Sequence, residues 1–291
     1  MTKKKKKTPM SLSSGRPPLV TKQKKSMTRT ATKFLINKHH LLEKRKQQAI
    51  AKGDKAEEEK ISAEIEALGG LEYYQQASLQ GQRRDRGGDS STVLMQWLYP
   101  RLAYPKTDTT EPEPLRMLEI GALSTENACS ESGHFEIERI DLRSQEEGIL
   151  QQDFMQRPLP TDSSEKFDIL SLSLVLNFVP DAKLRGDMLR RTIEFLHQPG
   201  RYVSTPDRAH DFPSLFLVLP APCVTNSRYL TEEHLVCIMS SLGYSQVASK
   251  TTKRLVYYLW KRDSRQQTGE QFTKKELRSG SSRNNFAIIL K

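Results

Sequence analysis

Residues 167–179 have the sequence FDILSLSLVLNFV, a long apolar stretch without a break. Such a stretch predicts a central parallel strand that is covered on both faces. Upstream, residues 115–120 (LRMLEI) and residues 135–142 predict two further strands. Downstream, Pro180-Asp181 favours the start of one helix, and Thr231 is suited to cap another. Strands that alternate with helices predict an α/β fold with a doubly wound sheet.

The remaining elements are expected on both sides of this centre. Residues 215–219 predict another buried strand, and residues 247–249 and 255–260 predict a final antiparallel pair. Towards the N-terminus, the apolar spacing over residues 33–68 predicts two helices joined at Gly53-Asp54. The apolar faces of these two helices are thin, so we expect them to dock on something else, either RNA or the main domain.

Composition divides the chain into four expected parts. The first, residues 1–32, is rich in Lys, Ser, Thr and Pro and predicts a disordered basic tail. A helical N-terminal region is expected at residues 33–104 and a Rossmann-like domain at residues 105–262. Residues 263–291 are expected to form a C-terminal extension.

The positive charge is concentrated at the N-terminus. Residues 1–55 hold 17 Lys and Arg side chains against two acidic ones, a net charge of +15, whereas residues 56–291 carry a net charge of −4. A basic arm on a nearly neutral body favours a nuclear address and an anionic polymer partner. The alternative is a tail that serves only solubility.

The cysteine spacing and the lengths of the apolar runs indicate the kind of cellular compartment in which the protein is expected. No apolar run approaches the ~18 residues that a membrane span needs, so we expect no membrane partner. The three cysteines form no CxxC pair, which indicates a reducing compartment without a disulfide framework or zinc ribbon. We expect all three to be small buried hydrophobic residues: Cys129, Cys223 and Cys237.

Gly121 and Asp141 lie where two successive strands are expected to end. A glycine at the end of a first strand lets the backbone approach a nucleotide-like ligand, and an acid about twenty residues later can accept hydrogen bonds from ribose hydroxyls. The dinucleotide fingerprint G-x-G-x-x-G is absent. Its absence favours S-adenosylmethionine, which has no phosphate, over a pyrophosphate-bearing cofactor.

Further candidates follow the third and fourth strands. Asp153 is placed to take an adenine amino group and Phe154 to pack beside the ring, although a turn acid and a core Phe fit equally well. Ser173 would approach the cofactor, and Asn177 and Phe178 would line the substrate side as candidate catalytic residues. A core Asn with satisfied hydrogen bonds is the alternative for Asn177.

One further loop is rich in Gly, Arg and Asp. Residues 81–91, which include Arg86, lie before a helix start and form either a cofactor contact or an ordinary connector. No catalytic Ser-His-Asp or Cys-His arrangement is evident, and the six histidines have no ligand spacing, so we expect no metal. Methyl transfer requires no such groups, because the protein's main task is positioning and desolvation.

Several motifs between residues 60 and 260 resemble the fungal family of nucleolar 25S rRNA adenine-N1 methyltransferases. The family motif near residue 220 has an extra Ala-Pro step in this chain. The motifs are GGLEYYQ (69–75), RGGDSS (86–91), LEIGALS (118–124), IDLRS (140–144), SLVLNFVPD (173–181) and LPAPCVTNSRY (219–229).

The resemblance implies a class I, S-adenosylmethionine-dependent methyltransferase that modifies N1 of an adenine in large-subunit rRNA. Gly121 and Asp141 match the family's cofactor positions. The resemblance also implies cofactor contacts for Asp153, Phe154, Ser173 and Arg86. The implied partner is large-subunit rRNA in the pre-ribosome, and the implied location is the nucleolus of the nucleus. The alternative function is a non-catalytic S-adenosylmethionine sensor that acts through a protein partner.

Overall fold

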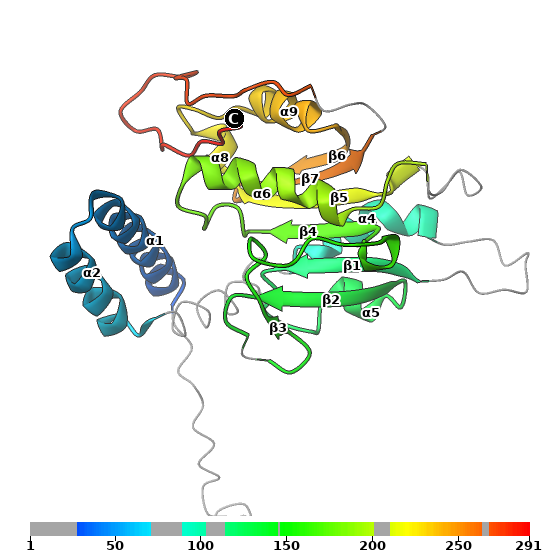
Figure 1. Ribbon diagram of the computed structural model, residues 1–291, viewed down its shortest axis with the longest axis horizontal. Coiled ribbons are helices and arrows are strands. Elements are labelled where there is room, and N and C mark those ends of the chain that lie inside the picture. The colour runs from blue at the N-terminus through cyan, green and yellow to red at the C-terminus, as the bar shows by residue number, and fades with distance from the viewer. Residues whose placement is uncertain (1–27, 71–88, 103–113, 145, 201–209, 264–267) are drawn as a thin grey trace, which may run out of the picture.

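The computed structural model describes residues 28–70, 89–102, 114–144, 146–200, 210–263 and 268–291. Its centre is a seven-stranded sheet with the order β3-β2-β1-β4-β5-β7-β6 (Figure 1). The strands are β1 (Leu115–Ile120), β2 (Phe135–Asp141), β3 (Leu150–Gln151), β4 (Ile169–Ser173), β5 (Ser214–Pro220), β6 (Tyr244–Thr251) and β7 (Leu255–Arg262).

The strand directions agree with a doubly wound sheet. Strands β3, β2, β1, β4 and β5 are parallel, and β7 pairs antiparallel with both β5 and β6. The chain runs outward from β1 to β2 and β3, then returns to add β4 on the other side of β1. The order therefore reverses between β1 and β4, and ligands of such sheets bind at this switch point, beyond the carboxyl ends of the strands.

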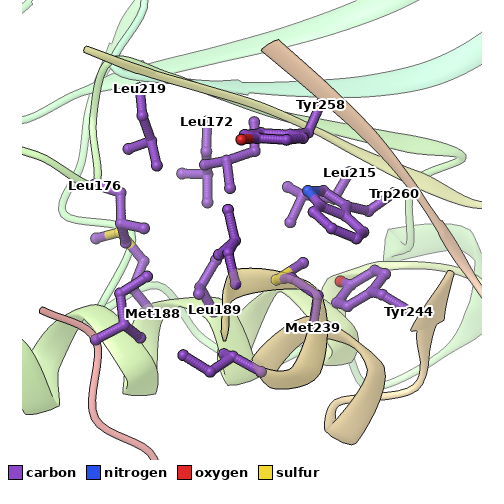
Figure 2. Close-up of a cluster of buried hydrophobic side chains, with 14 of the residues drawn as sticks. Leu172, Leu176, Met188, Leu189, Leu215, Leu219, Met239, Tyr244, Tyr258 and Trp260 are labelled. Carbon is purple, nitrogen blue, oxygen red and sulfur yellow. The ribbon is translucent and has the colours of Figure 1, made fainter. Parts of the chain in front are cut away.

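Helices cover both faces of the sheet. One face packs against α6 (Ala182–Phe195), α8 (Pro222–Thr225) and α9 (Glu232–Ser241), and the other against α4 (Ser91–Leu102) and α5 (Ala128–Glu131). Because side chains of a strand alternate between faces, neighbours in β5 separate: Leu217 joins the first core and Phe216 the second. Figure 2 shows Leu189 of α6 and Trp260 of β7 in the first of these cores.

The long apolar stretch at residues 167–179 is not one strand, which corrects the sequence-based expectation. Only residues 169–173 form β4, and the chain leaves the sheet at Leu174, whose φ is +60°. Leu176 nevertheless has 0% exposure, because the loop folds back and places this side chain in the core. Apolar residues were required here for burial rather than for strand pairing.

The two N-terminal helices form a hairpin with a small core of its own. They are α1 (Arg29–Lys52) and α2 (Lys55–Ala67), and they join at Gly53-Asp54 as predicted. Gly53 has a φ of +70°, which ends α1 in the left-handed region, and the Asp54 side chain caps α2 by accepting from the backbone N–H of Glu57. Figure 1 shows this hairpin apart from the sheet. None of the helices in the described ranges is both long and apolar enough to cross a membrane.

The cysteines are only partly as expected. Cys129 and Cys223 are buried, but Cys237 is exposed. The exposure follows from the geometry of α9, because Leu235, Ile238 and Met239 form its buried face and Cys237 points away from them. The expectation of three buried cysteines was therefore wrong for Cys237.

The C-terminal segment, residues 268–291, packs on the first core. Its apolar side chains join those of α6 and α9, and Figure 1 shows the segment running past α9 and α8. Gly186 of α6 has no room for a side chain, because a Cβ there would lie 1.9 Å from the carbonyl oxygen of Ile289. The buried residues of the segment are Phe272, Phe286, Ala287, Ile288 and Leu290.

Candidate functional site at the carboxyl edge of the sheet

Three of the predicted site residues lie side by side at the switch point. Gly121 follows β1, and the register aligns Ile120 with Ile140 of β2 and with Leu172 of β4. Asp141 and Ser173 are the next residues of those two strands, so they flank Gly121 at the same edge. These residues meet because parallel strands end at the same edge of the sheet, as the sequence analysis predicted.

Gly121 leaves β1 in a conformation that other residues rarely adopt. Its φ is +76°, and its backbone N–H donates to the carbonyl of Ile140 at 2.8 Å. A Cβ at this position would lie 2.5 Å from Cγ2 of Val175, in the loop after β4. The absence of a side chain therefore allows the loops after β1 and β4 to approach each other closely.

Asp141 ends β2 in a turn at the edge of the site. Its Oδ1 accepts from the backbone N–H of Arg143 at 2.8 Å, and its carbonyl accepts from the N–H of Gln152 at 2.9 Å. The side chain is half-buried. This position suits the predicted ribose contact, and the turn hydrogen bond also fits a structural role at the strand end.

Ser173 links β4 to the end of the Gly-, Arg- and Asp-rich loop that the sequence analysis gave as a cofactor contact or a connector. Its hydroxyl lies 2.7 Å from the hydroxyl of Ser90. Next to it, Asp89 accepts from the backbone N–H groups of Ser91 and Ala128, which ties the start of α4 to the start of α5. Ser90 therefore belongs to the site edge, and its membership of the RGGDSS motif was the signal available in the sequence. Arg86 of the same motif lies outside the described residues.

The two residues predicted after β3 occupy different environments. Asp153 is half-buried and its Oδ1 accepts from the backbone N–H of Met155 at 2.8 Å. Phe154 has 3% exposure and its ring centroid lies 5.2 Å from that of Phe195. Phe154 thus packs as a core residue of the loop, which is the alternative that the sequence left open.

Asn177 and Phe178 lie in the turn that follows β4. Asn177 Oδ1 is buried and has no hydrogen-bond partner among the residues that the structure describes. A buried amide oxygen without a donor costs free energy, so the arrangement favours a donor supplied by a ligand. Phe178 is 36% exposed. The expectation of a core Asn with satisfied hydrogen bonds does not fit this geometry.

Glu119 was not singled out from the sequence, although it lies two residues before Gly121. Both of its carboxylate oxygens accept from Nδ2 of Asn127 at 3.0 Å, and Arg139 Nε lies 3.8 Å away. Asn127 also caps α5. Glu119 therefore holds the far end of the loop that begins at Gly121. No pattern in the sequence distinguishes this acid from other strand acids.

The contribution of Glu119 to stability is expected to fall as the pH rises from about 4.5 to about 7, because burial raises the pKa of Glu119 from 4.5 to about 7. In that interval the folded state holds the proton more tightly than the unfolded state, and each unit of pKa difference corresponds to about 1.4 kcal/mol. Glu119→Gln should remove this contribution. Denaturant unfolding of the wild type and of Glu119→Gln at several pH values measures this contribution. Parallel pH profiles of the unfolding free energy would contradict the raised pKa of Glu119.

The match to known proteins extends over this whole site. The model of the family described as 25S rRNA (adenine(2142)-N(1))-methyltransferase, Bmt2, matches residues 59–288. The chain belongs to this family. The membership confirms the family predicted from the motifs, and the seven-stranded mixed sheet confirms the predicted Rossmann-like class I methyltransferase architecture.

Two relatives from the 25S rRNA methyltransferase family are similar in sequence to this chain over most of its length. The 25S rRNA adenine-N(1) methyltransferase of Schizosaccharomyces pombe is 38% identical over 87% of this chain and 89% of its own length. The 25S rRNA (adenine(2142)-N(1))-methyltransferase of Saccharomyces cerevisiae is 38% identical over 79% of this chain, which spans 63% of that protein.

Solved structures are more distantly similar. N-methyltransferase NodS from Bradyrhizobium japonicum, in complex with S-adenosyl-L-homocysteine, is 13% identical with a TM-score of 0.37 and covers 63% of this chain and 93% of its own. The 16S rRNA methylase RmtB is also 13% identical with a TM-score of 0.37, covering 82% of this chain and 76% of its own. The family assignment does not depend on these two similarities.

Proposed function

We propose that this chain transfers a methyl group from S-adenosylmethionine to N1 of an adenine in large-subunit rRNA. The observation that carries the proposal is the family match over residues 59–288, which includes every described residue of the carboxyl-edge site. The substrate is that of the named relatives.

The residues at the switch point fit the methyl donor. Gly121 offers a side-chain-free approach, and Asp141 offers carboxylate oxygens for ribose hydroxyls. S-adenosylmethionine carries no phosphate, which agrees with an acid rather than a cation at the end of β2. We assign Gly121, Asp141, Asp153 and Ser173 to cofactor binding, and S-adenosylmethionine supplies the methyl group when bound.

The loop after β4 is assigned to the target base. N1 of neutral adenine has a lone pair, so the reaction needs no general base, but N1 is engaged in Watson–Crick pairs and the base must be unpaired or flipped out. Oδ1 of Asn177, which has no partner among the described residues, is suited to accept a hydrogen bond from the adenine amino group. The exposed ring of Phe178 is suited to stack on the base. Together they would hold N1 towards the methyl group.

The proposed activity is tested with purified protein, labelled S-adenosylmethionine and unmodified large-subunit rRNA, followed by digestion to nucleosides. We expect labelled N1-methyladenosine. Small-subunit rRNA is the control and should stay unlabelled. Cofactor binding without any methylation of the large-subunit rRNA would instead support the non-catalytic sensor.

We further propose that the basic N-terminal tail directs the chain to rRNA and to the nucleolus. The support is the net charge of +15 over residues 1–55, of which residues 1–27 carry +9. Deletion of residues 1–27, which leaves α1 complete, should reduce rRNA affinity and flatten its salt dependence, with free cofactor bound normally. A fluorescent fusion of the truncated chain should lose nucleolar enrichment, and unchanged enrichment would place the address elsewhere in the chain.

A further inference from the structure

Arg185 of α6 is a charged side chain buried without a carboxylate in contact. The residue is 8% exposed, and no ion pair of the described residues includes it. Its guanidinium donates from Nε to the carbonyl of Val179 at 2.8 Å and from Nη2 to that of Pro180 at 3.2 Å. The third donor, Nη1, reaches the carbonyl of Ala287 at 2.7 Å. Its charge is therefore compensated by these three carbonyl dipoles and by the nearby charge of Asp181.

Because burying the charge of Arg185 is costly, the guanidinium must keep its hydrogen bonds to the surrounding carbonyls. A buried charge is costly unless its hydrogen-bonding groups are satisfied, and burial lowers the pKa of Arg185 to about 10, so it still carries its charge at neutral pH. The face of the Phe286 ring lies 4.3 Å from the guanidinium carbon and adds a cation–π contact. Because the donors form a rigid fork, they fix the relative positions of the carbonyls that they bind.

Two of these carbonyls belong to the loop that carries the candidate catalytic residues. The loop is anchored at its start by the N–H of Leu174, which donates to the carbonyl of Val218 at 3.0 Å. Its middle is anchored by Leu176, which Figure 2 shows next to Met188 of α6. Arg185 anchors its end. Asn177 and Phe178 lie between the second and the third anchor, so Arg185 limits how far they can move.

The third carbonyl connects this loop to the C-terminal segment. Besides the bond from Arg185 to Ala287, the N–H of Ile289 donates to the carbonyl of Ala182 at 2.9 Å. The missing side chain at Gly186 lets the segment lie directly on α6. Arg185 thus joins two parts of the chain that are about a hundred residues apart in sequence.

We propose that Arg185 is a positioning residue for methyl transfer, which fixes the loop of Asn177 and Phe178 against the C-terminal segment. The proposal rests on the proposed function of this site. Arg185 is not assigned any contact with the substrate or with S-adenosylmethionine. It acts through the backbone carbonyls of Val179 and Pro180.

The test uses the full chain with Arg185→Gln, which removes the charge and most donors, and Arg185→Lys, which keeps the charge but replaces the fork with a single ammonium group. We expect kcat at saturating rRNA to fall about 10-fold in the first variant and several-fold in the second, because a displaced loop misaligns the base. The affinity for S-adenosylhomocysteine should stay within about 2-fold, since Gly121 and Asp141 are untouched. Amide hydrogen exchange over residues 176–179 should accelerate about 10-fold.

Two controls separate positioning from loss of stability. Arg190→Gln removes another α6 arginine that donates to the C-terminal segment, at the carbonyl of Lys291, but not to the loop. Ile288→Val loosens the packing of the segment itself. Both should leave kcat and loop exchange near the wild-type values. Equal losses in these controls, or unchanged kcat in both Arg185 variants, would overturn the proposal.

The two hypotheses fail in different ways. If the wild-type chain methylates no rRNA, the proposed function is wrong, whatever the Arg185 variants do. If the wild type is active and the exchange over residues 176–179 does not change in Arg185→Lys, the positioning role is wrong and the proposed function stands. The Lys variant keeps the experiment informative if Arg185→Gln fails to fold.

Discussion

Gly121→Arg is expected to abolish the binding of S-adenosylmethionine. The backbone at this position has a φ of +76°, where a residue with a side chain costs about 1–2 kcal/mol. In addition, the new Cβ would lie 2.5 Å from Cγ2 of Val175, so the loops after β1 and β4 would have to separate. The rest of the arginine would then fill the edge between Asp141 and Ser173. Calorimetry with S-adenosylhomocysteine measures the loss.

The chain offers a matched control for the backbone strain. Gly133 has a φ of +70° but nothing within 4 Å of the position of a Cβ. Gly133→Arg therefore carries a similar conformational cost without the collision, and it should retain cofactor binding. Thermal unfolding of both variants shows whether they remain folded. Normal binding by a folded Gly121→Arg variant would remove Gly121 from the cofactor site.

Asn177→Ala is expected to lower kcat for rRNA methylation about 100-fold, with little change in cofactor affinity. The amide oxygen is a buried acceptor that lacks a donor among the described residues, and its loss would let the target adenine rotate away from the methyl group. The same change removes a buried acceptor with no partner in the described ranges, so the free energy of unfolding should stay equal or rise slightly. Activity and stability should therefore change independently.

Two further variants sharpen this prediction. Asn177→Asp keeps an oxygen acceptor and should retain more activity than Asn177→Ala. Phe178→Ala should lower the rate at least about 10-fold if the ring stacks on the base, and because Phe178 is 36% exposed it should cost less stability than the ~3–5 kcal/mol of a fully buried Phe. The readout is N1-methyladenosine in rRNA digests. Full methylation by Asn177→Ala would show that the loop after β4 does not hold the base.

The order of the elements followed from local signals in the sequence. The strand predicted at residues 115–120 is β1 itself. The helix start predicted at Pro180-Asp181 and the predicted cap Thr231 begin α6 and α9. Such signals are readable because a cap contacts backbone groups two or three residues away and a strand alternates every second residue. The placement of Gly121, Asp141 and Ser173 at one edge also followed, since parallel strands share their carboxyl ends.

Tertiary structure alone decided the properties that depend on distant partners. The strand predicted at residues 167–179 was too long, because only residues 169–173 form β4. An apolar residue such as Leu176 is also required where a loop is buried in the core, so the sequence pattern does not distinguish a buried loop from a strand. Burial of Phe154 against Phe195 and the raised pKa of Glu119 likewise come from neighbours that no sequence spacing reveals.

The sequence by itself therefore determined the family, the sheet and the edge where the ligand is expected. Only the tertiary structure showed the acceptor of Asn177 without a described donor, and the link from Arg185 to Ala287. The reason is physical: periodicity and capping are short-range, whereas desolvation and the hydrogen bonds of a buried charge depend on which distant segments the fold brings into contact.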